Sequence, residues 1–368
     1  MTTDLTPPAD ASATIALLLP LNGRLSEAGE SLRDGFFAAY YQQPPTRRPT
    51  VRVYEAAEDP AGAYRRAVAE GAGFVVGPLG KEAVTAVARV ADGRVPTLAL
   101  NILPDGLATP PRFYQYALAP EDEARQVAER LLADGRRSGA ALVPSGDRGA
   151  RVLAAFQGVY MAAGVSSVTS RTYAAGATDF SEQLASLLGF GDSQRRQQAI
   201  AAIVGRPLLF APRRRDDLQF LFFAGQPVQG RLLRAQLKFS YAGDVPVYST
   251  SDVYEPNADA NLDLEGVAFV DMPWMISEDP EITALRATVA HLWPGNARRR
   301  GRLYAMGFDV WQLVTELRTA GGAPPQALNG LTGRLTVDGG GRVHRGLDCV
   351  IVDADGRLRP LPPPSANL

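Results

Sequence analysis

The sequence predicts an α/β protein of two lobes, each built around a parallel sheet. Three observations support this fold class. Short apolar runs alternate with stretches of helical length along most of the chain, which is the pattern of strands joined by crossover helices. Several runs are apolar throughout, as expected for strands covered on both faces. A length of 368 residues corresponds to two domains, at a typical size of about 150 residues each.

The stretch 14–23 is predicted to be a buried strand that ends in the loop Pro20-Leu-Asn-Gly23. A helix over 27–42 follows at once. Loops after parallel strands lie at the carboxyl edge of the sheet, where open α/β folds bind their ligands. Asn22 and Gly23 are therefore candidate ligand contacts.

The rest of the first third repeats this alternation, with strands ending in small or polar loops. The predicted strands are 51–54, 74–76, 95–100 and 113–116, and the predicted helices are 59–71 and 81–91. The stretch 117–120 is predicted to cross into the second lobe. Glu121, Asp122 and Glu123 then open a helix, and their charge suits its positive N-terminus better than it indicates a metal site.

The second half of the chain continues with strands and helices and then changes character. The predicted strands are 139–143, 168–173, 218–223, 245–248 and 266–270, and the predicted helices include 179–188, 228–239, 280–291 and 304–319. A glycine turn at 338–341 joins two strand-like runs into a hairpin over 331–352. Disorder is expected at 1–13, and a proline-rich tail at 359–368.

The least regular stretch is 189–217, which contains a predicted helix at 193–204 and a run of charges. Arg213, Arg214 and Arg215 are followed directly by two aspartates. A solvated loop whose charges partly cancel is the simple interpretation. The alternative is that these three arginines face a partner.

Composition limits the possible functions. The chain has 38 basic and 39 acidic residues, a net charge of −1, so it shows no basic footprint for nucleic acid. Its single cysteine, Cys349, excludes an internal disulfide and lies in an apolar run typical of a buried structural thiol. No apolar run approaches the roughly 18 residues of a transmembrane helix. The first 13 residues show no signal peptide and no lipid-attachment cysteine.

The sequence contains no recognisable catalytic, cofactor-binding or metal-binding motif. The two histidines, His291 and His344, fall in different elements and are expected at the surface. There is no nucleophile elbow, no P-loop and no zinc-protease motif. Asp252 and Asp271 are the only acids that could be nominated for an enzyme acting on cell-wall fragments. We therefore expect a non-enzymatic protein without a metal or cofactor.

The loops that follow the predicted strands suggest a binding cleft between the two lobes instead. Their side chains are mostly small, amide or hydroxyl groups, with one tryptophan, as in ligand-binding clefts. Trp274 could equally be a cleft wall or a core residue. The candidate contacts are Asn22, Gly23, Gly77, Pro78, Leu79, Asn101, Ser145, Asp147, Gln226, Thr250, Ser251, Asp252 and Trp274.

The order of these loops resembles type I periplasmic binding proteins, and more narrowly the penicillin-binding protein activator family of LpoA or LppC lipoproteins. The resemblance covers about residues 14–358. It rests on 15–23, Gly35-Phe-Phe-Ala-Ala-Tyr-Tyr41, Val76-Gly-Pro-Leu79, Phe222-Phe-Ala-Gly-Gln-Pro227, Tyr248-Ser-Thr-Ser251, Asp271-Met-Pro-Trp274, Arg302-Leu-Tyr-Ala-Met-Gly-Phe-Asp309 and Leu328-Asn-Gly-Leu-Thr-Gly-Arg-Leu335.

The resemblance implies a two-lobed fold with a three-strand hinge. Lobe 1 would comprise 14–117 and 253–327, and lobe 2 would comprise 118–252 and 328–358. It also implies an outer-membrane-associated periplasmic lipoprotein that stimulates a bifunctional, class A penicillin-binding protein in peptidoglycan synthesis. Family members carry a lipidated cysteine, and many carry an N-terminal helical-repeat domain; neither occurs in the sequence as printed.

A small ligand in the cleft is the alternative function, as in a periplasmic solute receptor. Amino-acid-binding relatives place a hydroxyl residue in the loop after the third strand, where this chain has Leu79. A leucine side chain cannot donate a hydrogen bond to a ligand carboxylate. Each lost charge-assisted bond would cost about 1.5–3 kcal/mol, which argues against an amino acid but not against other small ligands. Asp309, in an apolar helix, is expected to cap or pair structurally.

Overall fold

The computed structural model describes residues 14–104, 106–166, 168–205, 213–319 and 327–362. The chain folds into two compact units. Unit 1 comprises Met1–Leu118 and Met272–Gly346, and unit 2 comprises Ala119–Asp271 and Leu347–Leu368. The α/β class and the two-lobed organisation predicted from the sequence are confirmed. The expectation for 1–13 lies outside the described residues.

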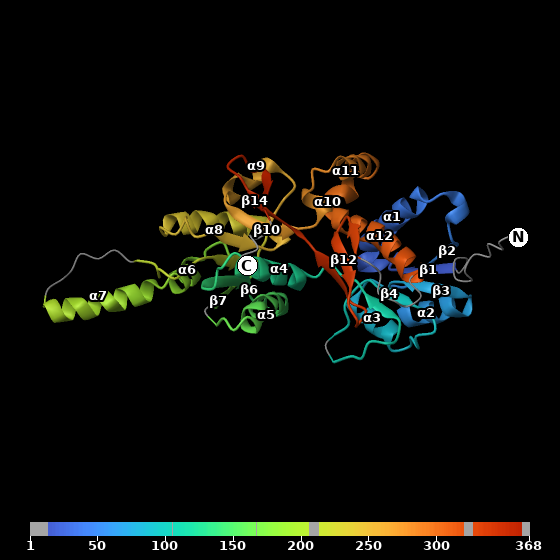
Figure 1. Cartoon of the computed structure of the whole chain (residues 1–368), viewed down its shortest axis with the longest axis horizontal. Helices are drawn as coiled ribbons and strands as arrows, with labels where there is room; N and C mark the ends of the chain where they lie inside the picture. Colours follow the sequence, from blue (N-terminus) through green and yellow to red (C-terminus); the bar gives the residue numbers. More distant parts are fainter. Residues whose placement is uncertain (1–13, 105, 167, 206–212, 320–326, 363–368) are drawn as a thin grey trace, which may run out of the picture. The chain divides into compact units, whose positions relative to one another are not determined.

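Unit 1 is built on a five-stranded parallel sheet of order β2-β1-β3-β4-β5. Figure 1 shows α2 and α3 on one face of this sheet and α1 and α12 on the other. The strands are β1 (Thr14–Leu19), β2 (Val51–Glu55), β3 (Ala72–Val76), β4 (Thr97–Ala99) and β5 (Phe113–Gln115), and the helices α1 (Ser26–Gln42), α2 (Pro60–Ala69), α3 (Lys81–Ala88), α10 (Pro273–Ile276), α11 (Pro280–Leu292) and α12 (Pro294–Thr319).

Unit 1 also holds a separate three-stranded antiparallel sheet, formed by β11 (Leu328–Gly330), β12 (Gly333–Val337) and β13 (Val343–Gly346). The predicted glycine turn joins β12 to β13, whose registered pairs include Val337 with Val343. The prediction of one hairpin over 331–352 was too long, because Asp348–Val352 pairs elsewhere as β14.

Unit 2 has a seven-stranded sheet of order β15-β14-β10-β9-β8-β6-β7. The strands from β10 to β7 run parallel, whereas β14 and β15 are antiparallel additions at one edge. Its strands are β6 (Gly139–Pro144), β7 (Val168–Tyr173), β8 (Leu221–Phe223), β9 (Val247–Ser249), β10 (Val267–Asp271), β14 and β15 (Leu358–Pro360), and its helices α4 (Pro120–Ala133), α5 (Asp147–Ala162), α6 (Ser181–Leu187), α7 (Phe190–Val204), α8 (Pro227–Phe239) and α9 (Ala258–Asn261).

The crossings between the units fall at different places from those expected. The first, after Leu118, differs from the prediction by one residue. The second was placed after 252 but lies after Asp271, because β10 pairs in parallel with β9 and stays in the sheet of unit 2. The third was placed after 327 but lies after Gly346, because β11 to β13 belong to unit 1. The tail expected from 359 overlaps β15, which pairs with β14, and its residues from 363 on lie outside the described ranges.

Helices α1 and α12 pack unusually closely in unit 1, and two glycines make this possible. A Cβ on Gly35 would lie 1.9 Å from the carbonyl oxygen of Tyr304, and one on Gly307 would lie 2.0 Å from that of Leu32. The ring of Phe36 then meets Trp311 edge to face, with centroids 5.4 Å apart. Both glycines are in motifs that carry the family resemblance, so the motifs have a packing role.

A fully buried carboxylate ties α12 to the segment that follows β11. Asp309 accepts hydrogen bonds from the backbone N–H groups of Leu331 and Thr332, each at 2.7 Å, and from the Thr332 hydroxyl. The Thr332 hydroxyl also contacts the Tyr116 hydroxyl. Burial raises the pKa of Asp309 to about 6, although these hydrogen bonds oppose the shift. The expectation that Asp309 pairs structurally is confirmed.

Candidate functional site

The candidate cleft residues divide between the two units, so the structure brings them together as two groups. Apart from Trp274, which follows β10 of unit 2, they lie at the carboxyl ends of parallel strands of their own unit. Unit 1 carries Asn22, Gly23, Gly77, Pro78, Leu79, Asn101 and Trp274, and unit 2 carries Ser145, Asp147, Gln226, Thr250, Ser251 and Asp252.

The loop after β3 is shaped by its backbone rather than by ligand-facing side chains. Gly77 has φ +97°, and a Cβ there would lie 2.1 Å from the carbonyl oxygen of Leu18, so only glycine fits. The bond from Gly77 to Pro78 is cis. Leu79 is buried, and its carbonyl oxygen accepts a hydrogen bond from Asn101 Nδ2 at 2.9 Å. Asn101 therefore fastens its own loop to the neighbouring one.

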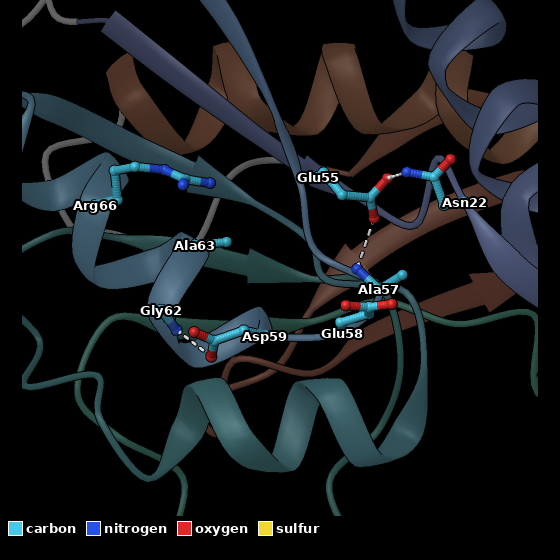
Figure 2. A pocket seen from close by; sticks show the side chains of 8 residues that line it. All are labelled: Asn22, Glu55, Ala57, Glu58, Asp59, Gly62, Ala63 and Arg66. Atoms are coloured by element: carbon cyan, nitrogen blue, oxygen red, sulfur yellow. Dashed lines mark hydrogen bonds between the residues drawn. The ribbon is translucent and has the colours of Figure 1, made fainter.

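The loop after β1 is held by Glu55, a residue that the sequence analysis did not single out. Glu55 Oε2 accepts from the Leu21 N–H at 3.0 Å and from Asn22 Nδ2 at 2.9 Å, and Oε1 accepts from the Ala57 N–H at 2.7 Å. Figure 2 shows Asn22 turned toward this carboxylate. Glu55 ends the strand next to β1, so its position at a strand end could have identified it.

A pocket of about 540 Å³ lies beside Glu55, and two of its acids, Glu55 and Asp59, make structural hydrogen bonds. Asp59 accepts the Gly62 N–H at 2.8 Å and so caps α2. Glu55 is occupied by the loop contacts described above. The full lining is Asn22, Glu55, Ala57, Glu58, Asp59, Gly62, Ala63 and Arg66.

Trp274 is a core residue of unit 1 rather than an open wall. Its side chain is buried, and its ring centroid lies 5.4 Å from that of Tyr304 on α12. Its backbone N–H donates to the Leu331 carbonyl oxygen at 2.8 Å. Of the two alternatives that the sequence left open, the core interpretation holds, and Trp274 is removed from the candidate ligand contacts.

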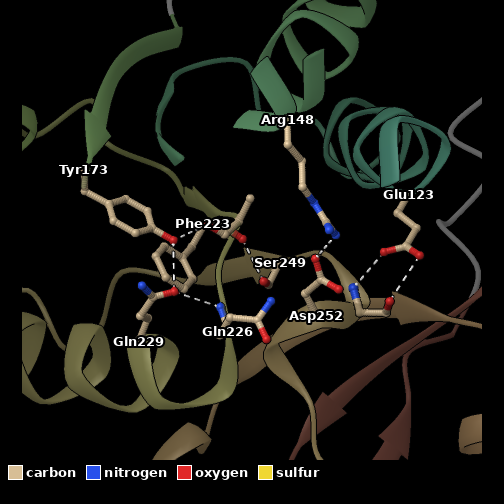
Figure 3. Close-up of polar contacts among 10 residues, drawn as sticks. Glu123, Arg148, Tyr173, Phe223, Gln226, Gln229, Ser249 and Asp252 are labelled. Carbon is tan, nitrogen blue, oxygen red and sulfur yellow. Dashed lines mark hydrogen bonds and ion pairs between the residues drawn. The ribbon is translucent and has the colours of Figure 1, made fainter. Parts of the chain in front are cut away.

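The clearest pocket among the candidate residues is in unit 2 and has a volume of about 240 Å³. It is lined by four of the predicted contacts, namely Ser145, Gln226, Thr250 and Asp252. Arg148, in the first turn of α5, forms an ion pair with Asp252 in the same pocket (Figure 3). Arg148 follows Asp147 directly but was not among the candidate contacts that the sequence analysis named.

A hydrogen-bond chain fixes the floor of this pocket. The Tyr173 hydroxyl donates to the Ala224 carbonyl oxygen at 2.7 Å, and Gln229 Oε1 accepts the Gln226 N–H at 3.0 Å (Figure 3). Burial raises the pKa of Tyr173 well above its ordinary value, so the phenol stays neutral. Thr250, which is only 1% exposed, also lines this pocket.

Two predicted contacts in unit 2 do not line this pocket. Ser251 is buried against α4, where its N–H and hydroxyl donate to the carboxylate of Glu123 at 2.9 and 3.1 Å. Glu123 thus accepts hydrogen bonds from the segment after β9, which explains an acid that the sequence assigned to the helix N-terminus. Asp147 is exposed in the first turn of α5.

The three arginines proposed to face a partner have unequal surroundings. Arg214 Nη2 lies 2.6 Å from Asp244 Oδ2, and Arg215 Nε lies 2.7 Å from Asp217 Oδ1. The charges of these two arginines are therefore balanced inside unit 2, as the simple interpretation held. Arg213 is exposed.

In the described ranges, no group of three or more His, Cys, Asp or Glu side chains is placed to hold a metal ion. The helices in those ranges include none with the length and apolarity needed to cross a bilayer.

Burial raises the pKa of Cys349 to about 11, so this thiol stays protonated at neutral pH. His344 lies 2.8 Å from Asp338 on the hairpin.

Comparison with known proteins gives consistent relatives. The family model described as LppC putative lipoprotein matches residues 8–350. The penicillin-binding protein activators LpoA of Photobacterium profundum and Vibrio vulnificus are 30% and 29% identical, over 93% and 90% of this chain and 56% and 55% of theirs. The chain thus spans about half the length of these curated relatives.

Solved structures show the same fold. Full-length LpoA from Haemophilus influenzae aligns with a TM-score of 0.77 at 23% identity, over 97% of this chain and 60% of that one. The C-domain of that protein, described as a regulator of PBP1A, aligns with a TM-score of 0.74 at 24% identity, over 95% of this chain and 100% of the domain. A putative branched-chain amino acid transporter protein from Rhodospirillum rubrum aligns with a TM-score of 0.72 at 18% identity, over 95% of this chain and 100% of that one.

Proposed function

This chain belongs to the LppC family of putative lipoproteins, and from that premise we propose that it binds and stimulates a class A penicillin-binding protein. The observation that carries the proposal is its relation to proteins named as activators of penicillin-binding proteins, at 30% identity over 93% of the chain. Alignment over the whole of a domain described as a regulator of PBP1A supports the same role.

The proposed mechanism is regulatory rather than catalytic. The acids that sequence analysis could nominate are used structurally, since Asp252 pairs with Arg148 and Asp271 is buried at the end of β10. The proposed location is the periplasmic side of the outer membrane, which suits both the lipoprotein family and a partner that builds peptidoglycan. The chain would then act by changing the conformation or the assembly of the synthase.

Direct binding is the first test of this proposal. The class A synthase of the same organism is immobilised, and the purified chain is titrated over it. We expect saturable binding to the class A synthase and no binding to a class B synthase of the same organism. Absence of binding to every class A synthase of that organism would contradict the proposal.

A second candidate function is suggested by the unit 2 pocket, which would hold a small polar ligand. Thr250 and the Arg148–Asp252 pair line it together with Gln226. A few convergent polar groups in a concave site are typical of small-ligand pockets.

A melting-temperature screen over amino acids, peptides and muropeptides tests the ligand. We expect a muropeptide or peptide to raise the Tm of the wild-type chain, because a ligand that binds only the folded state stabilises it. Thr250→Val, which keeps the volume and removes the hydroxyl, should abolish most of that shift, whereas Ser251→Ala, outside the pocket, should keep it. A flat screen with the wild-type chain would remove this candidate.

A further inference from the structure

Among the described residues of unit 2, the most exposed large apolar side chains are two aromatic rings at the end of α8. Phe239 is 89% exposed and Tyr241 is 92% exposed, with one residue between them. In the described part of the chain neither ring contacts another aromatic ring. Single exposed apolar residues are ordinary, but two fully exposed rings in one turn form a site of the kind that partners bury.

The backbone at Tyr241 makes its side chain harder to explain by folding. The Tyr241 N–H donates to the Lys238 carbonyl oxygen, and the Ala242 N–H donates to that of Leu237, which is the helix ending usually completed by glycine. Tyr241 has φ +53°, a left-handed conformation that disfavours tyrosine. Within the ranges that the structure describes, the exposed ring of Tyr241 makes no contact that would offset this backbone strain. A role in binding therefore explains a tyrosine at this position better than a role in folding does.

The charges around this turn favour a protein partner over a membrane. Lys238 lies 3.9 Å from Glu265, and Arg214 is paired with Asp244, three residues after Tyr241. Adsorption to an anionic bilayer needs an excess of basic residues, which these pairs remove. Protein interfaces, in contrast, are centred on aromatic and arginine side chains within a balanced polar rim.

One cation near the turn remains available. Arg213 is exposed, and no side chain of the described residues forms an ion pair with it. The Arg214–Asp244 pair fastens the segment carrying Arg213 to the turn after α8. A partner that fits these side chains would therefore have an apolar recess for the two rings and a carboxylate at the edge of that recess.

We infer that Phe239 and Tyr241, with Arg213, form the surface through which this chain docks on its synthase. The inference rests on the proposed function, because it takes the synthase as the occupant. We call these three residues the α8 docking surface. It retains one of the three arginines that the sequence suggested and adds the two aromatic residues, which lie outside the irregular stretch.

Binding of variants to the intact class A synthase tests this surface. Phe239→Ala and Tyr241→Gly are each expected to weaken binding at least fivefold, and the double variant at least thirtyfold. Arg213→Ala should weaken it less and reduce its salt dependence. Tyr241→Gly is expected to keep or raise the Tm, because glycine relieves the backbone strain, so lost binding cannot be attributed to unfolding.

Two exposed apolar residues elsewhere in unit 2 serve as controls. Met161→Ala on α5, 67% exposed, and Ile203→Ser on α7, 85% exposed, should bind as the wild type does. If the wild-type chain binds and the double variant binds equally well, the docking surface is wrong while the proposed function stands. If Ile203→Ser alone weakens binding, the surface lies on α7 and the inference is overturned.

The remaining outcomes are also decisive. If the wild-type chain does not bind the synthase, the proposed function fails and this inference fails with it. Sedimentation of the chain alone and flotation with phosphatidylglycerol vesicles are measured on the same variants. A change in self-association or in vesicle binding on Phe239→Ala, without a change in synthase binding, would assign the surface to a second copy or to lipid and overturn the inference.

Discussion

Replacing Gly307 with alanine is expected to lower the free energy of unfolding by about 3 kcal/mol or more. A Cβ there would lie 2.0 Å from the Leu32 carbonyl oxygen and 3.0 Å from the Phe36 nitrogen. Both are backbone atoms of α1, so a side-chain rotation cannot relieve the clash. The two helices must separate, which also opens the contact between Phe36 and Trp311.

Gly158→Ala is the matched control for this substitution. Gly158 lies inside α5, and a Cβ there would meet nothing within 4 Å. Alanine is the better helix former by up to about 1 kcal/mol, so this variant should be slightly more stable than the wild type. Urea unfolding of the three proteins measures both effects. A loss smaller than 1 kcal/mol for Gly307→Ala would show that the helices do not pack this closely.

Removing the carboxylate of Asp309 is expected to have the second largest effect. In Asp309→Ala, the N–H groups of Leu331 and Thr332 lose their acceptor inside the core. Each buried unsatisfied donor costs about 1–3 kcal/mol, so the free energy of unfolding at pH 5 should fall by about 3 kcal/mol. Glu278→Gln, at an exposed position of the same unit, should change stability by less than about 0.5 kcal/mol.

The pH dependence of the same residue gives a signed test. Burial raises the pKa of Asp309 to about 6, so the folded state holds its proton more tightly than the unfolded chain does. The resulting stabilisation is complete below pH 3.8, the ordinary value, and is lost as the pH rises through 6. It amounts to about 3 kcal/mol. The difference in stability between wild type and Asp309→Asn should therefore shrink by about that amount from pH 4 to pH 7, and a constant difference would contradict the assignment.

The two glycines and Asp309 explain why the resemblance motifs have the residues they have. Gly35 and Gly307 belong to separate motifs and meet at one helix contact. Asp309 ends the same motif as Gly307 and binds Leu331 and Thr332 of the last motif. These parts of the resemblance therefore describe how unit 1 is packed, and a partner surface need not coincide with them.

Much of the fold followed from the sequence because parallel strands and crossover helices leave clear local patterns. Apolar runs and turn residues predicted the succession of strands along the chain and the loops that follow them. The positions where the chain crosses between the units could not be predicted, because the sequences of β10 and β14 do not indicate which sheet each strand joins. Strand pairing decides that: β10 pairs with β9, and β14 pairs with β10, which is distant from it in sequence.

The candidate site was only partly predictable for a related reason. Ser145, Gln226, Thr250 and Asp252 follow strands, so strand-end reasoning found them and the structure gathers them in one pocket. The position of a residue after a strand does not predict the direction in which its side chain points. Trp274 turns into the core, Ser251 turns toward Glu123, and the exposure of Tyr241 depends on how α8 ends.

The most direct test of the account is the rate at which the class A synthase of the same organism makes cross-linked glycan, with and without this chain. We predict an increase of several fold that saturates with added chain and is reduced for the Phe239→Ala, Tyr241→Gly double variant. An unchanged rate at concentrations that saturate binding would contradict the central claim that this chain is an activator.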